Sequence, residues 1–223
     1  MPPDAVTYAI GDVHGCLSKL ERLFERCLRH SDDRPSRFVL IGDYIDRGPE
    51  SSGVIERLME VQREREVICL CGNHEAMMLE AIRTGDDGLW RLNGAAQTLE
   101  SYGTERLDQL PPRHIDWLAS LPLSFDDGRR YFVHAGVNPA APLDQQNAHD
   151  QLWIREPFLS SRRDYGRLIV HGHTPVVTGR PDLRANRLNL DTAAVFGGPL
   201  TAAFFTGDAT EPAGFLDDAD HVS

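Results

Sequence analysis

The stretch VTYAIGDVHG, residues 6–15, decides the fold, because five β-favouring residues run directly into a polar turn. The same pattern returns in FVLIGD (38–43), VICLCGNHE (67–75), YFVHAG (131–136) and LIVHGHTP (168–175). Short continuous apolar runs are typical of strands that are covered on both faces. The sequence therefore predicts five buried strands, each of which ends in a polar turn.

Helical periodicity separates the first three of these runs. Apolar residues recur every three or four positions over 17–28 and 54–61. Strand, helix, strand, helix, strand predicts an α/β fold with a partly parallel sheet. The later runs lack long helices between them, so we expect a second sheet to close the core. We also expect helical cap elements over 84–120, where Pro112 opens a helix, and a frayed tail over 207–223.

The length and the net charge of the chain exclude several classes of function. A chain of 223 residues predicts one domain, and its net charge of −11 disfavours nucleic acid and anionic membranes as partners. No apolar run approaches the roughly 18 residues of a membrane span, and the first residues lack the pattern of a signal peptide. The four cysteines form no CxxC pair and are expected to be reduced thiols. We therefore expect a cytoplasmic protein.

Ligands of α/β sheets bind beyond the carboxyl ends of the strands, so the polar turns should form one site. The candidate metal ligands in these turns are Asp12, His14, Asp43, Asn73, His134 and His173. Carboxylate, amide and imidazole ligands without a thiolate suit Mn²⁺, Fe or Zn²⁺ rather than copper(I). Six ligands exceed the needs of one catalytic ion and fit two ions with a bridging carboxylate. Such a pair can bind a phosphoryl oxygen and lower the pKa of a shared water towards ~7.

Three of these turns resemble the signature motifs of the phosphoprotein phosphatase family, within the calcineurin-like metallophosphoesterases. They are GDVHG (11–15), GDYIDRG (42–48) and GNHE (72–75). The stretches 134–136 and 171–175 resemble the two downstream motifs of bacterial and phage-type serine/threonine phosphatases. The match runs in the family's order from residue 6 to about residue 205. The resemblance implies a four-layer α/β/β/α sandwich of mixed sheets and a single catalytic domain spanning 1–223.

The resemblance also assigns the metal ligands. Asp12, His14 and Asp43 would hold the first ion. Asp43 would bridge to the second ion, whose other ligands would be Asn73, His134 and His173. Two divalent cations are implied, with Mn²⁺ expected and Fe or Zn²⁺ as alternatives.

The acid and the phosphate-binding groups follow from the same motifs. His74 would protonate the leaving oxygen, and Asp46 would orient His74. Asn73, Arg47 and Arg155 would bind the phosphate of the substrate; Arg155 lies in WIRE (153–156), which resembles the family stretch that supplies a second arginine. The planar fork of an arginine can bind two phosphate oxygens at once.

The implied function is a serine/threonine protein phosphatase in which a two-metal-activated hydroxide attacks phosphorus in line. Alternatives are a symmetrical diadenosine tetraphosphate hydrolase, a broad-specificity or tyrosine-directed phosphatase, and a degenerate binding protein on the same fold. Glu75 and the intact DRG (46–48) favour the phosphatase. Ala95 and Ala193 stand where the family usually has glycine, which leaves the shape of the substrate groove open.

The remaining histidines and Glu75 have more ordinary interpretations. We expect Glu75 to anchor its loop and His171 to support the site structurally. Four histidines match no motif and are expected at the surface: His30, His114, His149 and His221. The paired aspartates in polar loops carry no predicted chemistry.

Overall fold

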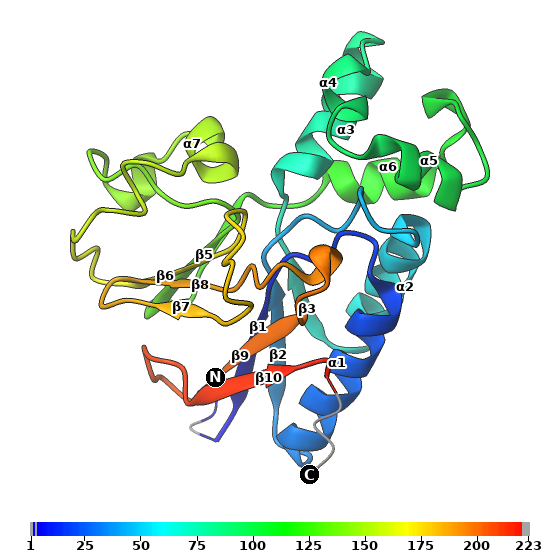
Figure 1. The fold of residues 1–223 in the computed structure, drawn as a ribbon. Helices are drawn as coiled ribbons and strands as arrows, with labels where there is room; N and C mark the ends of the chain where they lie inside the picture. The colour runs from blue at the N-terminus through cyan, green and yellow to red at the C-terminus, as the bar shows by residue number, and fades with distance from the viewer. Residues whose placement is uncertain (1, 3, 220–223) are drawn as a thin grey trace.

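Two five-stranded sheets pack face to face in the computed structural model, which describes residue 2 and residues 4–219 (Figure 1). The first sheet contains, in spatial order, β10 (Gly214–Asp217), β9 (Thr201–Thr206), β1 (Val6–Ile10), β2 (Ser36–Leu40) and β3 (Glu66–Cys69). The second contains β4 (Ser124–Asp126), β5 (Arg130–Val133), β6 (Leu168–His171), β8 (Arg187–Asn189) and β7 (Asp182–Leu183). All five predicted strands are therefore confirmed.

Strand direction brings the polar turns to one edge. Strands β1, β2 and β3 are parallel neighbours, and so are β5, β6 and β8 in the second sheet. β9, β10, β4 and β7 run antiparallel to their neighbours, so both sheets are mixed. The carboxyl ends of parallel strands share an edge, so the turns after β1, β2 and β3 emerge side by side.

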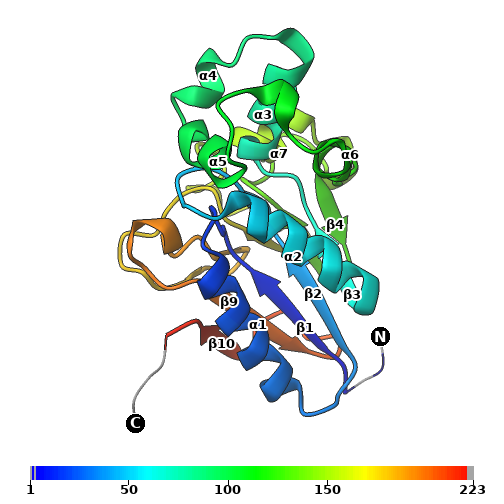
Figure 2. The ribbon, with the colours of Figure 1, turned by 90° about the vertical axis from the view of Figure 1, so that its right-hand side faces the viewer.

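Helices cover the outer faces of the sheets. α1 (Leu17–Ser31) and α2 (Ser51–Glu64) lie across the first sheet (Figure 2). Between β3 and β4 the chain forms α3 (Asn73–Thr84), α4 (Gly88–Arg91), α5 (Ala95–Ser101), the 3₁₀ turn η1 (Leu107–Gln109) and α6 (Pro112–Ala119). α7 (Ala148–Trp153) and the 3₁₀ turns η2 (Leu143–Gln145) and η3 (Ala194–Phe196) belong to the second half. Pro112 opens its helix as predicted.

Burial explains the layers. Side chains from both sheets, including Ala9, Val39, Phe132 and Val170, form the core between the sheets. A second cluster packs α1, α2 and the inserted helices against the first sheet, and a third covers the outer face of β5 and β6 with residues after α7. The predicted α/β/β/α order of layers is confirmed.

Two expectations about surface segments are wrong. The predicted frayed tail contains β10, whose residues Gly214–Asp217 pair with β9 and extend the first sheet at its edge; residues 220–223 of that tail lie outside the described residues. His114 is buried rather than exposed, because Tyr102 and Glu56 bind its two ring nitrogens at 2.8 and 3.0 Å.

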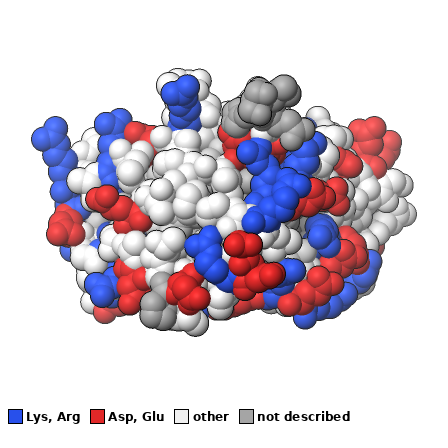
Figure 3. All heavy atoms as spheres, turned by 90° about the horizontal axis from the view of Figure 1, so that it is seen from below, with Lys and Arg blue, Asp and Glu red and all other residues white. Residues whose placement is uncertain are grey.

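Within the described residues, no helix has both the length and the apolarity to cross a membrane. The face in Figure 3 intermixes acidic and basic side chains.

Candidate active site

The polar turns of both sheets meet at one buried cluster. Asp12 and His14 follow β1, Asp43 follows β2, Asn73 opens α3 after β3, and His134 and His173 follow β5 and β6. The two sheets are joined directly here: the backbone N–H of His173 donates to Asp12 Oδ2 at 3.0 Å, and His134 Nε2 lies 2.8 Å from Asn73 Oδ1. The structure therefore brings together all six predicted metal ligands, each of them buried.

The turns that carry these side chains have an unusual backbone. Five of the site residues have a positive φ, between 44° and 70°: His14, Asp43, Asp46, Arg47 and His173. A left-handed conformation is costly for residues other than glycine and persists only where the surrounding structure holds it. Much of that support comes from Glu75, whose carboxylate accepts the backbone N–H groups of Asp43, Tyr44 and Gly72 at 2.8–2.9 Å. The expected anchoring role of Glu75 is confirmed.

Two histidines turn their lone pairs into the cluster. His14 Nδ1 lies 2.8 Å from the carbonyl oxygen of Ile45, and His134 Nδ1 lies 2.9 Å from that of Ile41. A carbonyl only accepts, so both Nδ1 atoms carry the proton and each neutral ring keeps its lone pair on Nε2. This is how a metal-binding histidine is usually oriented.

The His134 lone pair faces other acceptors, since Nε2 lies 2.8 Å from Asn73 Oδ1 and 3.4 Å from Asp43 Oδ1. The His14 lone pair lies 3.4 Å from Asp43 Oδ2 and is shared with a donor, the Arg47 guanidinium. Asp12 Oδ1 and His173 Nε2 are buried and have no hydrogen-bond partner among the described residues. Buried acceptors that lack a donor would be stabilised by a bound cation.

The donor set fits two divalent cations. Donor atoms of Asp43, His134 and His173 lie within 4.8 Å of one another, and so do those of Asp43, His14 and His74. Asp43 belongs to both groups, as a bridging carboxylate would. The first group contains three of the expected ligands of the second ion. The other group brings in His74, which the resemblance treats as an acid, and it leaves out Asp12.

Burial sets the charge of the ligand histidines. It lowers the pKa of His14 and of His173 to about 3, and it also lowers the pKa of His134. A neutral imidazole is the form that binds a metal. Burial alone would raise the pKa of Asp43, but the surrounding histidines, His134 foremost, outweigh it and hold the carboxyl below its usual range. Asp43 is therefore held as an anion, with three neutral rings (His14, His134 and His173) and the more basic His74 around it.

His74 is held differently. Its Nδ1 lies 2.7 Å from Oδ2 of Asp46, a carboxylate with no solvent exposure. Burial would lower the pKa of His74, yet the negative charges of Asp43 and Asp46 outweigh burial and raise it. His74 Nε2 lies 3.9 Å from Asp43 Oδ2, so the ring spans from Asp46 to the ligand cluster. A protonated His74 can donate from Nε2 into the site.

The two predicted phosphate-binding arginines differ in their surroundings. Arg47 is half-buried; its Nη1 donates to His14 Nε2 at 2.7 Å, and its guanidinium lies 5.6 Å from the ring centroid of Phe196. Arg155 follows α7, is exposed, and has no side-chain hydrogen bond or ion pair with the described residues. The end of α7 lies beside the cluster, since the rings of Trp153 and His173 are 6.2 Å apart. The structure thus joins Arg47 to the ligands and leaves Arg155 free at the rim.

The sequence patterns missed several residues that support the site. Trp90 and Thr98 donate hydrogen bonds to Asp46 from α4 and α5. Lys19, the single lysine of the sequence, donates to the carbonyl oxygens of Ala194 and Gly198 at 2.9 and 2.5 Å and ties α1 to η3. No local sequence pattern links Lys19 to Ala194, 175 residues further along the chain.

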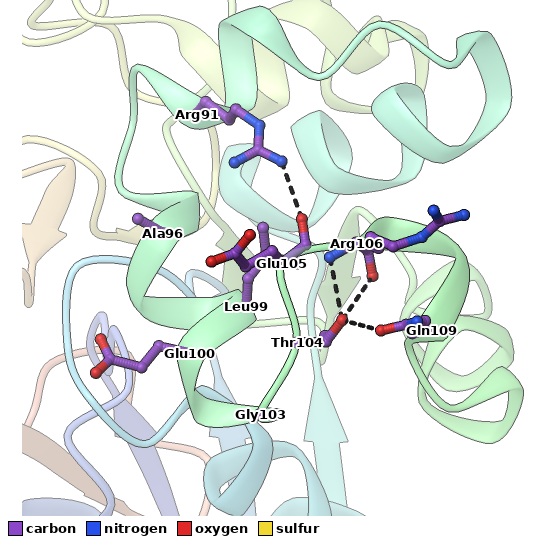
Figure 4. A pocket seen from close by; sticks show the side chains of 9 residues that line it. All are labelled: Arg91, Ala96, Leu99, Glu100, Gly103, Thr104, Glu105, Arg106 and Gln109. Carbon is purple, nitrogen blue, oxygen red and sulfur yellow. Dashed lines mark hydrogen bonds between the residues drawn. The ribbon is translucent and has the colours of Figure 1, made fainter.

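Two further features lie outside the ligand cluster. His171 is buried against Phe158, and its Nδ1 lies 3.1 Å from the carbonyl oxygen of Gly172, which agrees with a structural role. A hollow of about 860 Å³ lies between α5 and the 103–109 segment, lined by residues such as Leu99, Glu100 and Arg106 (Figure 4). Thr98 of the same helix contacts Asp46 instead, so the hollow is separate from the cluster.

Mixed sheets joined at a buried aspartate–histidine cluster, with a second histidine–aspartate pair beside it, define a two-metal phosphoesterase class of site. The family model of the calcineurin-like phosphoesterases matches residues 6–203. The chain therefore belongs to the calcineurin-like phosphoesterase family, as its motifs predicted.

The proteins to which this chain is similar bear the names of different activities. The chain is 32% identical over 205 residues to serine/threonine-protein phosphatase 1 of Salmonella typhimurium, covering 88% of this chain and 90% of the relative. It is 27% identical to the asymmetrical bis(5'-nucleosyl)-tetraphosphatase PrpE of Oceanobacillus iheyensis, covering 88% and 87%. A cold-active protein tyrosine phosphatase shares the fold, with a TM-score of 0.67 at 18% identity over 97% of this chain and 81% of that one.

Proposed function

We propose that this chain is a metal-dependent protein phosphatase that hydrolyses phosphoserine and phosphothreonine. The observation that carries the proposal is the shared carboxylate of Asp43, which faces two neutral histidines, His14 and His134, and a separate histidine, His74, whose pKa is raised by Asp43 and Asp46. Hydrolysis of an alkyl phosphate needs both a site for the phosphate and a proton for a poor leaving group. The relative from Salmonella typhimurium, which aligns over nearly its whole length, supports the protein substrate.

The residues divide into three roles. Asp12, His14, Asp43, Asn73, His134 and His173 would hold two divalent cations, Mn²⁺ in our proposal, and the bound pair would supply charge and a water of lowered pKa. Arg47 and Arg155 bind the phosphate oxygens from the rim, with the amide of Asn73 beside them. His74 donates its Nε2 proton to the departing serine or threonine oxygen. Asp46 fixes the ring through Nδ1 and stabilises its positive charge.

A second candidate is hydrolysis of dinucleoside tetraphosphates. One observation favours it: Phe196 is 65% exposed beside the Arg47 guanidinium, so a base could stack there while the phosphates reach the cluster. The relative from Oceanobacillus iheyensis bears that activity in its name.

A substrate panel tests the proposal. Purified protein with Mn²⁺ is assayed on a phosphoserine peptide, a phosphothreonine peptide, a phosphotyrosine peptide, diadenosine tetraphosphate and p-nitrophenyl phosphate. We expect the highest kcat/KM on the first two peptides. A higher kcat/KM on diadenosine tetraphosphate would favour the second candidate; two ADP would indicate symmetrical cleavage, and ATP with AMP asymmetrical cleavage. Metal binding without any hydrolysis would indicate a binding protein.

We also propose that the chain acts as one catalytic domain in the cytoplasm. Burial raises the pKa of the thiols of Cys27, Cys69 and Cys71, and all four cysteines are free, which suits a reducing compartment. Fractionation of the producing cells with an antibody to the chain would test the location.

A further inference from the structure

Asp46 receives hydrogen bonds from the inserted helices as well as from His74. The indole Nε1 of Trp90, in α4, donates to Asp46 Oδ1 and Oδ2 at 3.0 and 2.9 Å. The hydroxyl of Thr98, in α5, donates to Oδ1 at 2.7 Å. Oδ2 also lies 2.7 Å from His74 Nδ1. Four contacts from three side chains therefore surround one carboxylate that no water reaches.

The direction of each proton in this network is determined. A carboxylate only accepts, so the single proton of the Thr98 hydroxyl is used on Asp46 Oδ1. Ser51, 3.0 Å away, must then donate its own proton to Thr98. The backbone N–H of Asp46 donates to the Ser51 and Thr98 oxygens at 3.1 and 2.8 Å. These contacts hold the carboxylate and its backbone together, so the Asp46 side chain has one orientation.

That orientation decides which nitrogen of His74 faces the ligand cluster. Thr98 holds Oδ1 and the Trp90 indole bridges both oxygens, so Oδ2 is turned to bind His74 Nδ1 and His74 Nε2 lies towards Asp43. Without these donors the carboxylate could rotate about its Cβ–Cγ bond, because rotation about such a bond is soft. The Nδ1–H contact would then weaken, and the His74 ring would no longer be held with Nε2 towards Asp43.

Both donors come from helices inserted between β3 and β4, and neither comes from the sheets. Trp90 is 1% exposed and packs in the same cluster as Ala95 and Leu99, so its indole is fixed from several sides. The carbonyl oxygen of Gly94, between α4 and α5, also accepts the backbone N–H of Arg47. The inserted helices therefore position the acid pair and the phosphate-binding turn together.

We propose that Trp90 and Thr98 are positioning residues that act through Asp46 to hold the His74 proton in place for the leaving group. The inference rests on the proposed function, since it presumes that His74 is the proton donor. It assigns the inserted helices a part in the chemical step, in addition to covering the core.

The test compares variants that remove one donor each. Trp90→Phe removes the indole N–H, Thr98→Val removes the hydroxyl, and Thr98→Ser retains it. Trp117→Phe is the matched control, because Trp117 Nε1 donates to Gln62 at 2.7 Å in the same inserted region, away from Asp46. For each variant, kcat is measured on a phosphoserine peptide and on p-nitrophenyl phosphate, with metal content measured alongside.

We expect kcat on the phosphoserine peptide to fall about 10-fold in Trp90→Phe and Thr98→Val, as is usual when a supporting hydrogen-bond partner is removed. On p-nitrophenyl phosphate, whose leaving group departs without a proton, we expect a loss of about 2-fold. Thr98→Ser and Trp117→Phe should match the parent protein on both substrates. Should Trp90→Phe fail to fold, the Thr98→Val and Thr98→Ser pair decides the question.

Equal losses on the two substrates, loss of bound metal, or the same selective loss in Trp117→Phe would overturn the positioning role. His74→Asn separates this result from a failure of the proposed function. If His74→Asn lowers kcat selectively on phosphoserine while Trp90→Phe and Thr98→Val do not, only the positioning role is wrong. If His74→Asn shows no selectivity, the acid role itself is wrong, and the inference with it.

Discussion

Two kinds of histidine meet at Asp43, and they differ in what binds Nδ1. In His14 and His134 that nitrogen donates to a backbone carbonyl, and burial keeps the ring neutral. In His74 it meets the buried carboxylate of Asp46, and the ring is favoured as a cation. In the proposed mechanism, the same side chain thus serves as a metal ligand at His14 and His134 and as a proton donor at His74.

The comparison shows that the group bound to Nδ1, a carbonyl or a carboxylate, determines whether the imidazole is neutral or favoured as a cation. Burial disfavours the charged form of every histidine in the cluster, and only a second charge can reverse it. The ligand region, which contains His14 and His134, depends on main-chain carbonyls that follow β2. The acid region, the pair of His74 and Asp46, depends on side chains from the inserted helices. Variants in one region should therefore leave the other region intact.

The largest effect should come from the residue that both regions share. Asp43→Ala removes the carboxylate common to both donor groups, so we expect loss of bound metal and of activity on every substrate. A chelator should have the same effect on the parent protein, with Mn²⁺ restoring activity. Metal analysis and p-nitrophenyl phosphate hydrolysis measure both. Full activity in the chelated, metal-free protein would exclude the two-metal proposal.

The next effect should be confined to the acid region. His74→Asn should lower kcat on a phosphoserine peptide by ~10²–10⁴, because the serine alkoxide leaves poorly without a proton. The loss should be markedly smaller on p-nitrophenyl phosphate. Asp46→Asn should act in the same direction, and the double variant should add little, since the pair works as a unit. Additive losses would show that the two residues act independently.

The two arginines should affect binding of the substrate phosphate and leave both histidine groups intact. Arg47→Ala and Arg155→Ala should each lower kcat/KM by ~10², because a charged two-point contact to phosphate is lost. Metal content should stay unchanged. Inhibition by inorganic phosphate provides an independent measurement. Normal kinetics and normal phosphate inhibition in Arg155→Ala would remove that exposed residue from the site.

The smallest effect should come from outside both histidine groups. Lys19→Met removes the ammonium that holds the carbonyl oxygens of Ala194 and Gly198, so we expect the free energy of unfolding to fall by ~1–2 kcal/mol. KM should rise because Phe196 in η3 loses its support, while kcat changes little. Urea unfolding and steady-state kinetics check both. An unchanged unfolding midpoint would show that the contact contributes nothing.

The sequence predicted the ligand region well because its signals are local. Each ligand directly follows an apolar run, and the run itself predicts the strand that places it. Five runs with similar polar ends were therefore sufficient to predict that Asp12, His14, Asp43, Asn73, His134 and His173 meet at one edge of the sheets.

Only part of the acid region was predicted, because the residues that support Asp46 lie far from it in the sequence. Asp46 and His74 lie in motifs, but Trp90 and Thr98 are 44 and 52 residues from Asp46, and no local pattern links them. The same limit explains the two errors. β10 is a four-residue edge strand whose only neighbour in the sheet is the distant β9, and His114 is buried because residues of two other segments satisfy its ring.

The most direct test of the two kinds of histidine is to count metal ions in matched variants. His134→Ala and His74→Ala each remove one buried imidazole, and both proteins are dialysed against metal-free buffer before elemental analysis. The account predicts about one ion per chain in His134→Ala and about two in His74→Ala, as in the parent protein. Equal loss of metal in the two variants would contradict it, because His74 would then be a ligand like the others.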